Sequence, residues 1–458
     1  MTTSDSNRGL KPKDQRPIYA KKPSGVLLKY RQWFGYSLLA VFIIMPFIKV
    51  NGEQFLLFNI IERKFVIFGM VFWPQDLHIF VFGMLIFLVF IVLFTVVYGR
   101  VWCGWACPQT VFMELIFRKV EYWIEGDANQ QRKLDKMPMS SEKFFIKATK
   151  HTIFLAISFV ISNLFLSYVI GVDALVKIMA DPVSQHLGGF FSLVIFTLVF
   201  YGVFSYVREI VCTTICPYGR LQGVLLDEQS LVVAYDYQRG EPRGHLKKNA
   251  DLAEQGDCID CNLCVQVCPT GIDIRDGLQL ECVNCTACID ACDSVMAKIN
   301  KPPKLIGFYS SKQIDENTKE KNTTRIVAYS IVLALLLGIF GWLIFSRTTV
   351  GGTLLRAAGS GYQVSADGTV SNLYNLELIN KSGKELPFDL KPTDKDFKIK
   401  IINPRDVLKK GETAQFSFFL ITESKNIKNY KTDVKIEVNS EGKIVESLKT
   451  TFISPPTN

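Results

Sequence analysis

A double run of cysteines between Cys258 and Cys292 constrains this chain more than any other part of its sequence. The first run reads C-x2-C-x2-C-x3-C-P, and the second, after a gap of thirteen residues, reads C-x2-C-x2-C-x3-C with Asp293 in place of the proline. Three thiolates at this spacing can wrap one iron–sulfur cube while the fourth reaches another. Zinc ribbons use two separated C-x2-C pairs, so zinc sites, like a disulfide knot, are the weaker interpretation.

The pattern is that of a bacterial two-cluster ferredoxin, in which the fourth cysteine of each run binds the other cluster. We therefore expect two [4Fe-4S] clusters with crossed ligand sets. The first set is Cys258, Cys261, Cys264 and Cys292. The second set is Cys282, Cys285, Cys288 and Cys268. Clusters of this type move one electron at a time, so the chain is expected to transfer electrons.

Long apolar segments indicate a polytopic α-helical membrane protein. The chain of 458 residues is 48% hydrophobic and contains 34 Phe, and five segments are apolar enough to span a bilayer. The expected spans are 34–50, 77–98, 151–170, 189–207 and 324–345. The first is the shortest and contains Pro46.

Basic residues beside the spans predict their orientation, because short cytoplasmic loops are enriched in Lys and Arg. They are numerous before the first span and between the second and third, whereas the loop between the third and fourth carries only Lys177. We therefore expect the N-terminus, the 99–150 loop and the 208–323 segment in the cytoplasm and the C-terminal tail outside. All twelve cysteines then lie on the reducing side. The net charge of +9 reflects this bias rather than nucleic-acid binding.

Two further cysteine pairs follow the second and fourth expected spans. Both have the form C-x3-C-P, with Cys103, Cys107 and Pro108 in one and Cys212, Cys216 and Pro217 in the other, offset by 109 residues. The repetition suggests two parallel units related by an axis along the membrane normal, which would gather the four cysteines. Proline suits the first helical position, so each second cysteine is expected at a helix start.

The setting of these four cysteines favours metal binding. The helix dipole and an upstream arginine, Arg100 or Arg208, would favour thiolate, the form that binds metal. Soft thiolates favour Cu(I), but a third iron–sulfur cluster fits the same residues, and the spacing does not separate the two. A structural role as small buried residues is the weaker alternative. The residues from Gln109 to Trp123 predict an amphipathic helix along the inner membrane surface.

The four histidines offer little support for another metal site. They are His78, His151, His186 and His245, and none has a partner at helical spacing, so haem binding is not expected. An outer copper-uptake site formed by His78 and His186 is weaker than plain interfacial roles.

The tail after residue 346 alternates polar and apolar residues, which predicts a small antiparallel β-sandwich of immunoglobulin-like type. We interpret it as a docking module for an outer partner, with a structural role as the alternative. The expected domains are a basic tail (1–33), a four-span membrane domain (34–217), a linker (218–257), the ferredoxin (258–300), a connector (301–323), the fifth span (324–345) and the sandwich (346–458).

This order of spans, two C-x3-C-P motifs, a ferredoxin and an outer sandwich resembles the cytochrome c oxidase accessory proteins of the CcoG type, also called FixG or RdxA. The resemblance covers nearly the whole chain from about residue 30, although the front part is also similar to membrane polyferredoxins of nitrate and nitrous oxide respiration. It implies a multi-pass protein of the bacterial inner membrane that reduces Cu(II) to Cu(I) and supplies copper to a haem-copper oxidase. It also implies that the copper-handling residues are Cys103, Cys107, Cys212 and Cys216.

The expected partners are copper, copper chaperones, oxidase assembly factors and membrane lipid, with a homodimer left open and no nucleic acid. Two alternatives to a cupric reductase remain. One is a relay between a quinol pool and a partner enzyme, with a third cluster on the four paired cysteines; the other is a copper chaperone or assembly scaffold without turnover. Iron content separates the first two, because two clusters contain about eight irons per chain and three contain about twelve.

Overall fold

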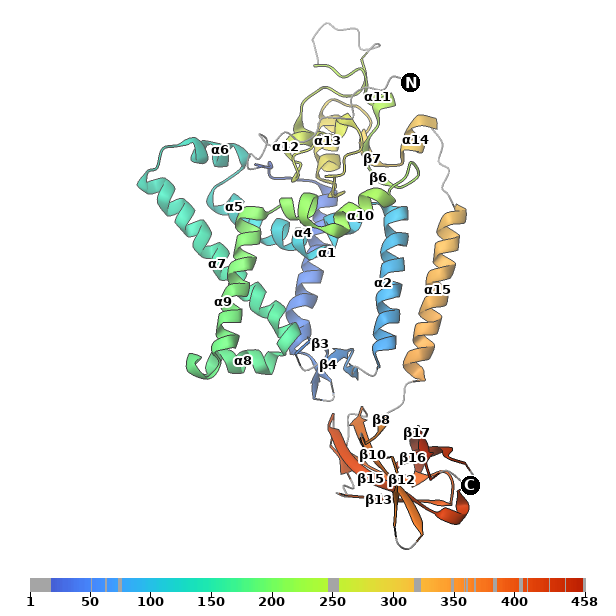
Figure 1. Cartoon of the computed structure of the whole chain (residues 1–458). Helices are drawn as coiled ribbons and strands as arrows, with labels where there is room; N and C mark the ends of the chain where they lie inside the picture. The colour runs from blue at the N-terminus through green and yellow to red at the C-terminus, as the bar shows by residue number, and fades with distance from the viewer. Residues whose placement is uncertain are drawn as a thin grey trace. The chain divides into compact units, whose positions relative to one another are not determined.

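A computed structural model of the chain (Figure 1) describes residues 18–50, 52–61, 64–72, 76–245, 255–316, 323–346 and 350–455, the last with gaps at 358, 360, 366–367, 382–384, 403–406, 410, 428 and 441. Most of the expected basic tail, residues 1–17, lies outside the described residues. The chain divides into two compact units. The first comprises Met1–Ile48, Gln54–Ile61 and Gly83–Leu337, and the second Lys49–Glu53, Glu62–Phe82 and Gly338–Asn458.

Four helices of the described residues are long and apolar enough to cross a membrane. They are His78–Tyr98, Ser141–Ile170, Leu187–Val207 and Ile326–Phe345, which correspond to four of the five expected spans. In Figure 1 they are α2 (Leu77–Tyr98), α7 (Ser141–Ile170), α9 (Leu187–Gly202) with its π-helical continuation η6 (Val203–Val207), and α15 (Thr323–Phe345).

The remaining expected span, 34–50, is displaced. Helix α1 runs Val26–Ile44 and ends in the 3-10 turn η2 (Met45–Phe47), so residues 26–33, which we assigned to the tail, are helical. The helix begins early because the carboxylate of Asp290 accepts hydrogen bonds from the backbone N–H groups of Leu27 and Leu28. The first two turns of α1 carry charged side chains, and α1 is not among the four candidate spans.

Short helices follow the second, third and fourth expected spans. Their bounds are α3 (Val101–Trp105), α4 (Pro108–Phe112), η4 (Met113–Phe117), α5 (Arg118–Ile124), α6 (Ala128–Lys136), α8 (Val172–Ala180), η5 (Val183–Gln185), η7 (Val211–Ile215) and α10 (Pro217–Leu225). The consecutive elements α4, η4 and α5 confirm the helix predicted for 109–123, with a π-helical middle. Its charged residues do not form the exposed face expected of an amphipathic helix, because Arg118 and Glu121 are only 3% and 2% exposed.

The ferredoxin region lies beside α4 and α10, at one end of α1 and α2 (Figure 1). It contains α12 (Leu263–Gln266), η8 (Ile274–Asp276) and α13 (Ala287–Lys298). The segments expected to be linker and connector contribute structure to it: β6 (Val232–Tyr235) pairs antiparallel with β7 (Ile306–Tyr309), near α11 (Tyr237–Gly240) and α14 (Ser311–Glu316). Apolar side chains of both strands share one core with α13 and the cysteine loops.

The tail forms the predicted antiparallel sandwich. One sheet has the order β13 (Phe397–Ile401), β15 (Thr413–Glu423), β10 (Thr369–Asn380), β8 (Val350–Arg356), with β9 (Gln363–Val364) also on β10. The other has the order β12 (Asp389–Pro392), β16 (Lys431–Ser440), β17 (Lys443–Ile453), and β11 (Leu386–Pro387) pairs with β14 (Val407–Leu408). Alternate residues of β10, β15 and β16 fill the shared core. The same unit holds β1 (Lys49–Val50), β4 (Lys64–Ile67) and β5 (Met70–Phe72).

Candidate redox metal site

The eight cysteines of the double run surround two adjacent hollows. The first is lined by Cys258, Cys261, Cys264 and Cys292. The second is lined by Cys268, Cys282, Cys285 and Cys288, and Cys264 also reaches it. The fourth cysteine of each run therefore joins the triplet of the other run, which is the grouping that crossed ligand sets require.

Both triplets follow the same backbone path. Asp260 and Asn262 in the first have φ angles of 52° and 55°, and Asn284 and Thr286 in the second have 51° and 66°. These pairs stand two and four residues after the first cysteine of each triplet. Left-handed backbone at non-glycine residues is costly and persists at sites that require it. Here it bends each loop so that three thiols face one hollow.

The surroundings of these thiols fit a cationic metal cluster. Burial raises the pKa of Cys264 to about 11 and that of Cys282 and Cys292 to about 12, so the thiols are neutral until a metal displaces their protons. The rest of the lining is largely apolar, including Val233, Ile272 and Met296. A bound [4Fe-4S] cluster supplies one-electron redox chemistry.

The second cysteine of each C-x3-C-P motif lies at a helix start, as predicted. Cys107 is the N-cap of α4 and Cys216 the N-cap of α10, both with extended backbone and with proline as the first helical residue. Cys103 lies inside α3 and Cys212 inside the π-helix η7. Departures from the regular α-helix of this kind are frequent at functional sites.

The structure gathers these four cysteines. Burial, and after it the negative charges that Cys107, Cys103 and Cys216 would carry as thiolates, raises the pKa of Cys212 to about 12. The pKa of Cys103 rises to about 11 through burial, and Cys107 and Cys216 raise it further. Nearby like charges disfavour ionisation, so a cation bound among these thiols would favour their thiolate forms. The four side chains therefore form a second sulfur-rich site beside the two hollows.

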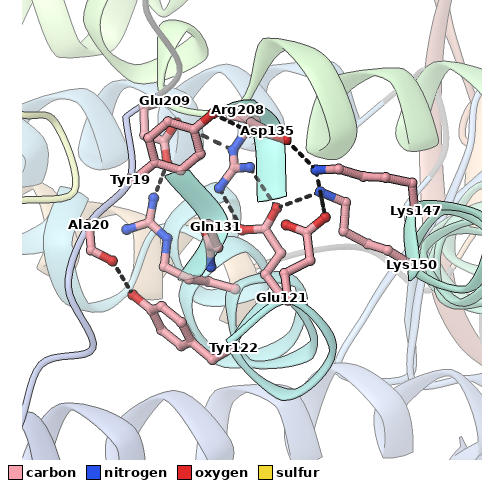
Figure 2. A network of polar contacts seen from close by, with 12 residues as sticks. Tyr19, Ala20, Glu121, Tyr122, Gln131, Asp135, Lys147, Lys150, Arg208 and Glu209 are labelled. Atoms are coloured by element: carbon pink, nitrogen blue, oxygen red, sulfur yellow. Dashed lines mark hydrogen bonds and ion pairs between the residues drawn. The ribbon is translucent and has the colours of Figure 1, made fainter. Parts of the chain in front are cut away.

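The expectation that an upstream arginine favours thiolate holds in direction for Arg100, whereas Arg208 is paired with a carboxylate. Arg100 does lower the pKa of Cys103, but burial outweighs it. Arg208 instead forms a two-pronged ion pair with Glu121, with Nη1–Oε1 and Nη2–Oε2 distances of 2.7 and 2.8 Å (Figure 2). Burial alone would raise the pKa of Glu121, but Arg208, followed by Lys150, lowers it overall.

This ion pair belongs to a buried network that the sequence did not reveal. Lys150 of α7 binds both Glu121 and Glu125, at 3.5 and 3.0 Å. Lys147 continues this series of ion pairs, because its Nζ lies 2.8 Å from a carboxylate oxygen of both Glu125 and Asp135 (Figure 2). Beside it, Arg118 pairs with Glu209. The network holds the residues that immediately precede Cys212 against α5 and α7.

A polar side chain missing from the prediction contacts Cys103 directly. Gln222 of α10 is fully buried, and its Oε1 accepts a hydrogen bond of 2.8 Å from the Cys103 thiol. Its Nε2 donates to the hydroxyl oxygens of Tyr218 and Thr95, at 2.7 and 3.1 Å. No local pattern marks Gln222, because its partners come from three different elements.

The four-cysteine site packs directly against the ferredoxin loops. Cys103 shares an apolar cluster with Val283 and Cys285 of the second triplet, and Cys212 packs on the same cluster. Gly104 permits this approach: a Cβ there would clash with the carbonyl oxygen of Val283 and lie 3.0 Å from that of Asn284. The two sulfur-rich regions are therefore in van der Waals contact.

Outside these cysteine groups, two of the histidines contact polar side chains. His186 lies 3.0 Å from Asp181, and His151 lies 2.9 Å from the Tyr201 hydroxyl. Among the described residues, no three His, Cys, Asp or Glu side chains are placed to hold a single metal ion. Each cysteine of a cubane ligand set binds its own iron, so such ligands stand farther apart than those of one ion. The same finding covers Cys103, Cys107, Cys212 and Cys216: as placed here, no three of these four side chains meet around a single ion.

The fold and the cysteine groups define an iron–sulfur membrane protein of the ferredoxin type. Family profiles described as "4Fe-4S dicluster domain", "4Fe-4S binding domain" and "IG-like fold at C-terminal of FixG" match residues 207–311, 80–126 and 340–455. Among curated proteins, RdxB of Cereibacter sphaeroides is 34% identical over 86% of this chain and 85% of its own length, and RdxA of the same organism is 35% identical over 82% and 81%. FixG of Rhizobium meliloti is 41% identical over 66% and 58%.

The chain belongs to the family of RdxA, RdxB and FixG, as its motifs predicted. It is thus an oxidoreductase-type iron–sulfur protein. Among solved structures, a FixG-related protein from Vibrio parahaemolyticus aligns with 23% of this chain and 97% of its own length, at 16% identity and a TM-score of 0.21.

Proposed function

We propose that this protein is a cupric reductase, which reduces Cu(II) to Cu(I) at Cys103, Cys107, Cys212 and Cys216. The eight cysteines of the double run would hold two [4Fe-4S] clusters in crossed sets, loaded with electrons by a cytoplasmic or membrane donor. The observation that carries the proposal is the packing of Cys103 and Cys285 in one apolar cluster. A soft-ligand site directly against a cluster-binding loop is suited to one-electron reduction of a bound ion.

The four thiols favour the reduced product. Thiolate ligands prefer Cu(I) to Cu(II), and apolar surroundings disfavour the ion of higher charge. Both effects raise the potential of the copper couple and make reduction more favourable. The step adds one electron to Cu(II) and breaks no covalent bond, while the thiols lose protons as they bind the metal.

The wider setting of this activity follows from the same proposal. The positive-inside pattern and the confinement of all cysteines to residues 103–292 favour a ferredoxin region in the cytoplasm of a bacterium and a sandwich domain outside its inner membrane. The Cu(I) product would be handed to copper chaperones or assembly factors of a haem-copper oxidase. The sandwich would dock an outer partner.

The test uses full-length protein, reduced anaerobically and freed of excess reductant before Cu(II) is added. A Cu(I)-specific chelator should then report about two Cu(I) per chain, one for each reduced cluster. The variant C103S/C107S should keep its iron and lose most Cu(I) formation. The control T214A changes an exposed residue inside the second motif and should behave like the parent. Normal Cu(I) formation by the cysteine variant would refute the assignment.

A second candidate is an electron relay between a quinol pool and a partner enzyme, with a third cluster on the four paired cysteines. The match of the "4Fe-4S binding domain" profile to residues 80–126, which include Cys103 and Cys107, favours it. In that case C103S/C107S would lose iron as well as electron transfer. A copper chaperone without turnover would bind Cu(I) in the chelator assay and form none.

A further inference from the structure

Helix α1 carries a buried guanidinium at the junction of the two sulfur-rich regions. Arg31 is 5% exposed, and its Nε donates a hydrogen bond of 2.8 Å to the carbonyl oxygen of Gly104, inside the first C-x3-C-P motif. Its Nη1 lies 4.0 Å from Glu114 Oε2, and Glu114 also pairs with Arg118 at 2.7 Å. Arg31 is therefore only loosely neutralised, because its nearest carboxylate is shared with a closer arginine.

The same guanidinium lies close to the second triplet. Gly104 abuts the carbonyl groups of Val283 and Asn284, so the hydrogen-bond partner of Arg31 rests on the loop between Cys282 and Cys285. Helix α1 is also held to α13, which carries Cys288 of the second ligand set, by the hydrogen bonds from Leu27 and Leu28 to Asp290. A buried positive charge favours any additional negative charge placed near it.

The first triplet has an arginine of its own. Arg275 lines the first hollow. It is bound by Asp273, at 2.6 Å, and by Asp260. The two hollows therefore have different cations beside them. Arg275, at the first hollow, is paired with two carboxylates of the ferredoxin loops, whereas Arg31 of α1 and Arg100, which donates to the carbonyl oxygen of Leu280, lie beside the second run.

We propose that Arg31 sets the reduction potential of the cluster on the second triplet and leaves that of the first largely unchanged. The inference rests on the proposed assignment of two clusters to the double cysteine run. Reduction adds an electron, and a fixed buried cation favours that state. Arginine keeps its charge at any physiological pH. The charge of Arg31 would favour the electron on the second cluster, next to the four-cysteine site. The negative charge of Glu114 would partly offset this stabilisation.

The experiment measures both midpoint potentials in full-length, copper-free protein by redox titration followed by electron paramagnetic resonance. In R31Q, one cluster should lose about tenfold in its ratio of reduced to oxidised form at fixed ambient potential, which is about 59 mV for one electron. In E114Q the same cluster should shift in the opposite direction. R31K keeps the charge without the guanidinium geometry and should lie close to the parent.

The control K29Q removes the same charge from the exposed face of α1 and should move neither potential. Unchanged potentials in R31Q, equal shifts of both clusters, or a downward shift in E114Q would each overturn the proposal. If R31Q does not retain its clusters, E114Q and R31K decide the question alone. The titration contains no copper, so the two proposals fail separately. A failed cupric-reductase assay would refute the proposed function and not the role of Arg31. Normal copper reduction with unchanged potentials in R31Q would refute only the role of Arg31.

Discussion

The carboxylate of Asp290 is the N-terminal cap of a helix far away in the sequence. Its two oxygens accept hydrogen bonds of 3.1 and 2.8 Å from the N–H groups of Leu27 and Leu28, the latter 262 residues away. No side chain of α1 caps its own start. Asp290 is 9% exposed and stands on α13 between Cys288 and Cys292. The contact therefore fastens α1 to the helix that carries one cysteine of each ligand set.

The cost of removing this carboxylate can be worked out from the two bonds. Hydrogen bonds to charged groups contribute about 1.5–3 kcal/mol each, whereas loss of an N-cap costs about 0.5–2 kcal/mol. The negative charge at the helix start adds about 0.3–1 kcal/mol. We expect Asp290→Ala to destabilise the joint by about 3 kcal/mol, a factor of about a hundred. Asp290→Asn keeps an acceptor without the charge and should cost about half as much.

The assay is loss of the iron–sulfur absorbance of full-length protein against urea, in detergent and without oxygen. Asp276→Ala, at a carboxylate whose side chain is 61% exposed, is the matched control and should keep the parent's midpoint. Gly25→Ala attacks the same joint from α1, because its new Cβ would clash with the Asp290 carboxylate. The reasoning is refuted if Asp290→Ala melts with the control. It is also refuted if Asp290→Ala lowers the urea midpoint and Gly25→Ala does not. The loss of stability would then come from the cysteine loops and not from the contact between Asp290 and α1.

Three further predictions concern a close backbone contact, an ion pair and a core position of the sandwich. Gly104→Val places a side chain against the carbonyl oxygen of Val283 and should slow Cu(I) formation at least tenfold with the iron content kept; an unchanged rate in the chelator assay would mean that the close approach is dispensable. Glu121→Gln removes the buried carboxylate that pairs with Arg208 and Lys150 and leaves Arg208 only its longer contact of 3.6 Å with Glu209. It should destabilise the membrane unit by about 3 kcal/mol, seen as earlier thermal aggregation than in a variant of an exposed glutamate. Phe418→Ala empties a fully buried position of the sandwich and should cost about 3–5 kcal/mol, so protease should cleave the sandwich domain while the visible absorbance stays unchanged.

Much of this molecule is predictable because the decisive patterns are local. Three cysteines within seven residues leave few ways to arrange their thiols, and the proline after Cys107 or Cys216 predicts the helix start that the structure shows. Period-two alternation likewise predicted the sandwich, since every second residue of β10 and β15 packs inward.

The contacts that position the site could not be predicted, because they join distant segments without a local signature. Arg31 donates a hydrogen bond to Gly104, 73 residues further along the chain. Asp290, which lies far from the apolar run in sequence, accepts the hydrogen bonds that let α1 begin before that run. Arg208 was expected to favour a nearby thiolate, and it pairs with Glu121 because this carboxylate offers a charged, two-pronged partner, which a neutral thiol cannot match.

The most direct test of the account is the iron, sulfide and copper content of anaerobically purified protein and of its C103S/C107S variant. Two clusters on the double run and a separate copper site predict about eight irons per chain in both proteins, with bound copper in the parent alone. About twelve irons in the parent, falling to about eight in the variant, would contradict the copper assignment and place a third cluster on the four paired cysteines.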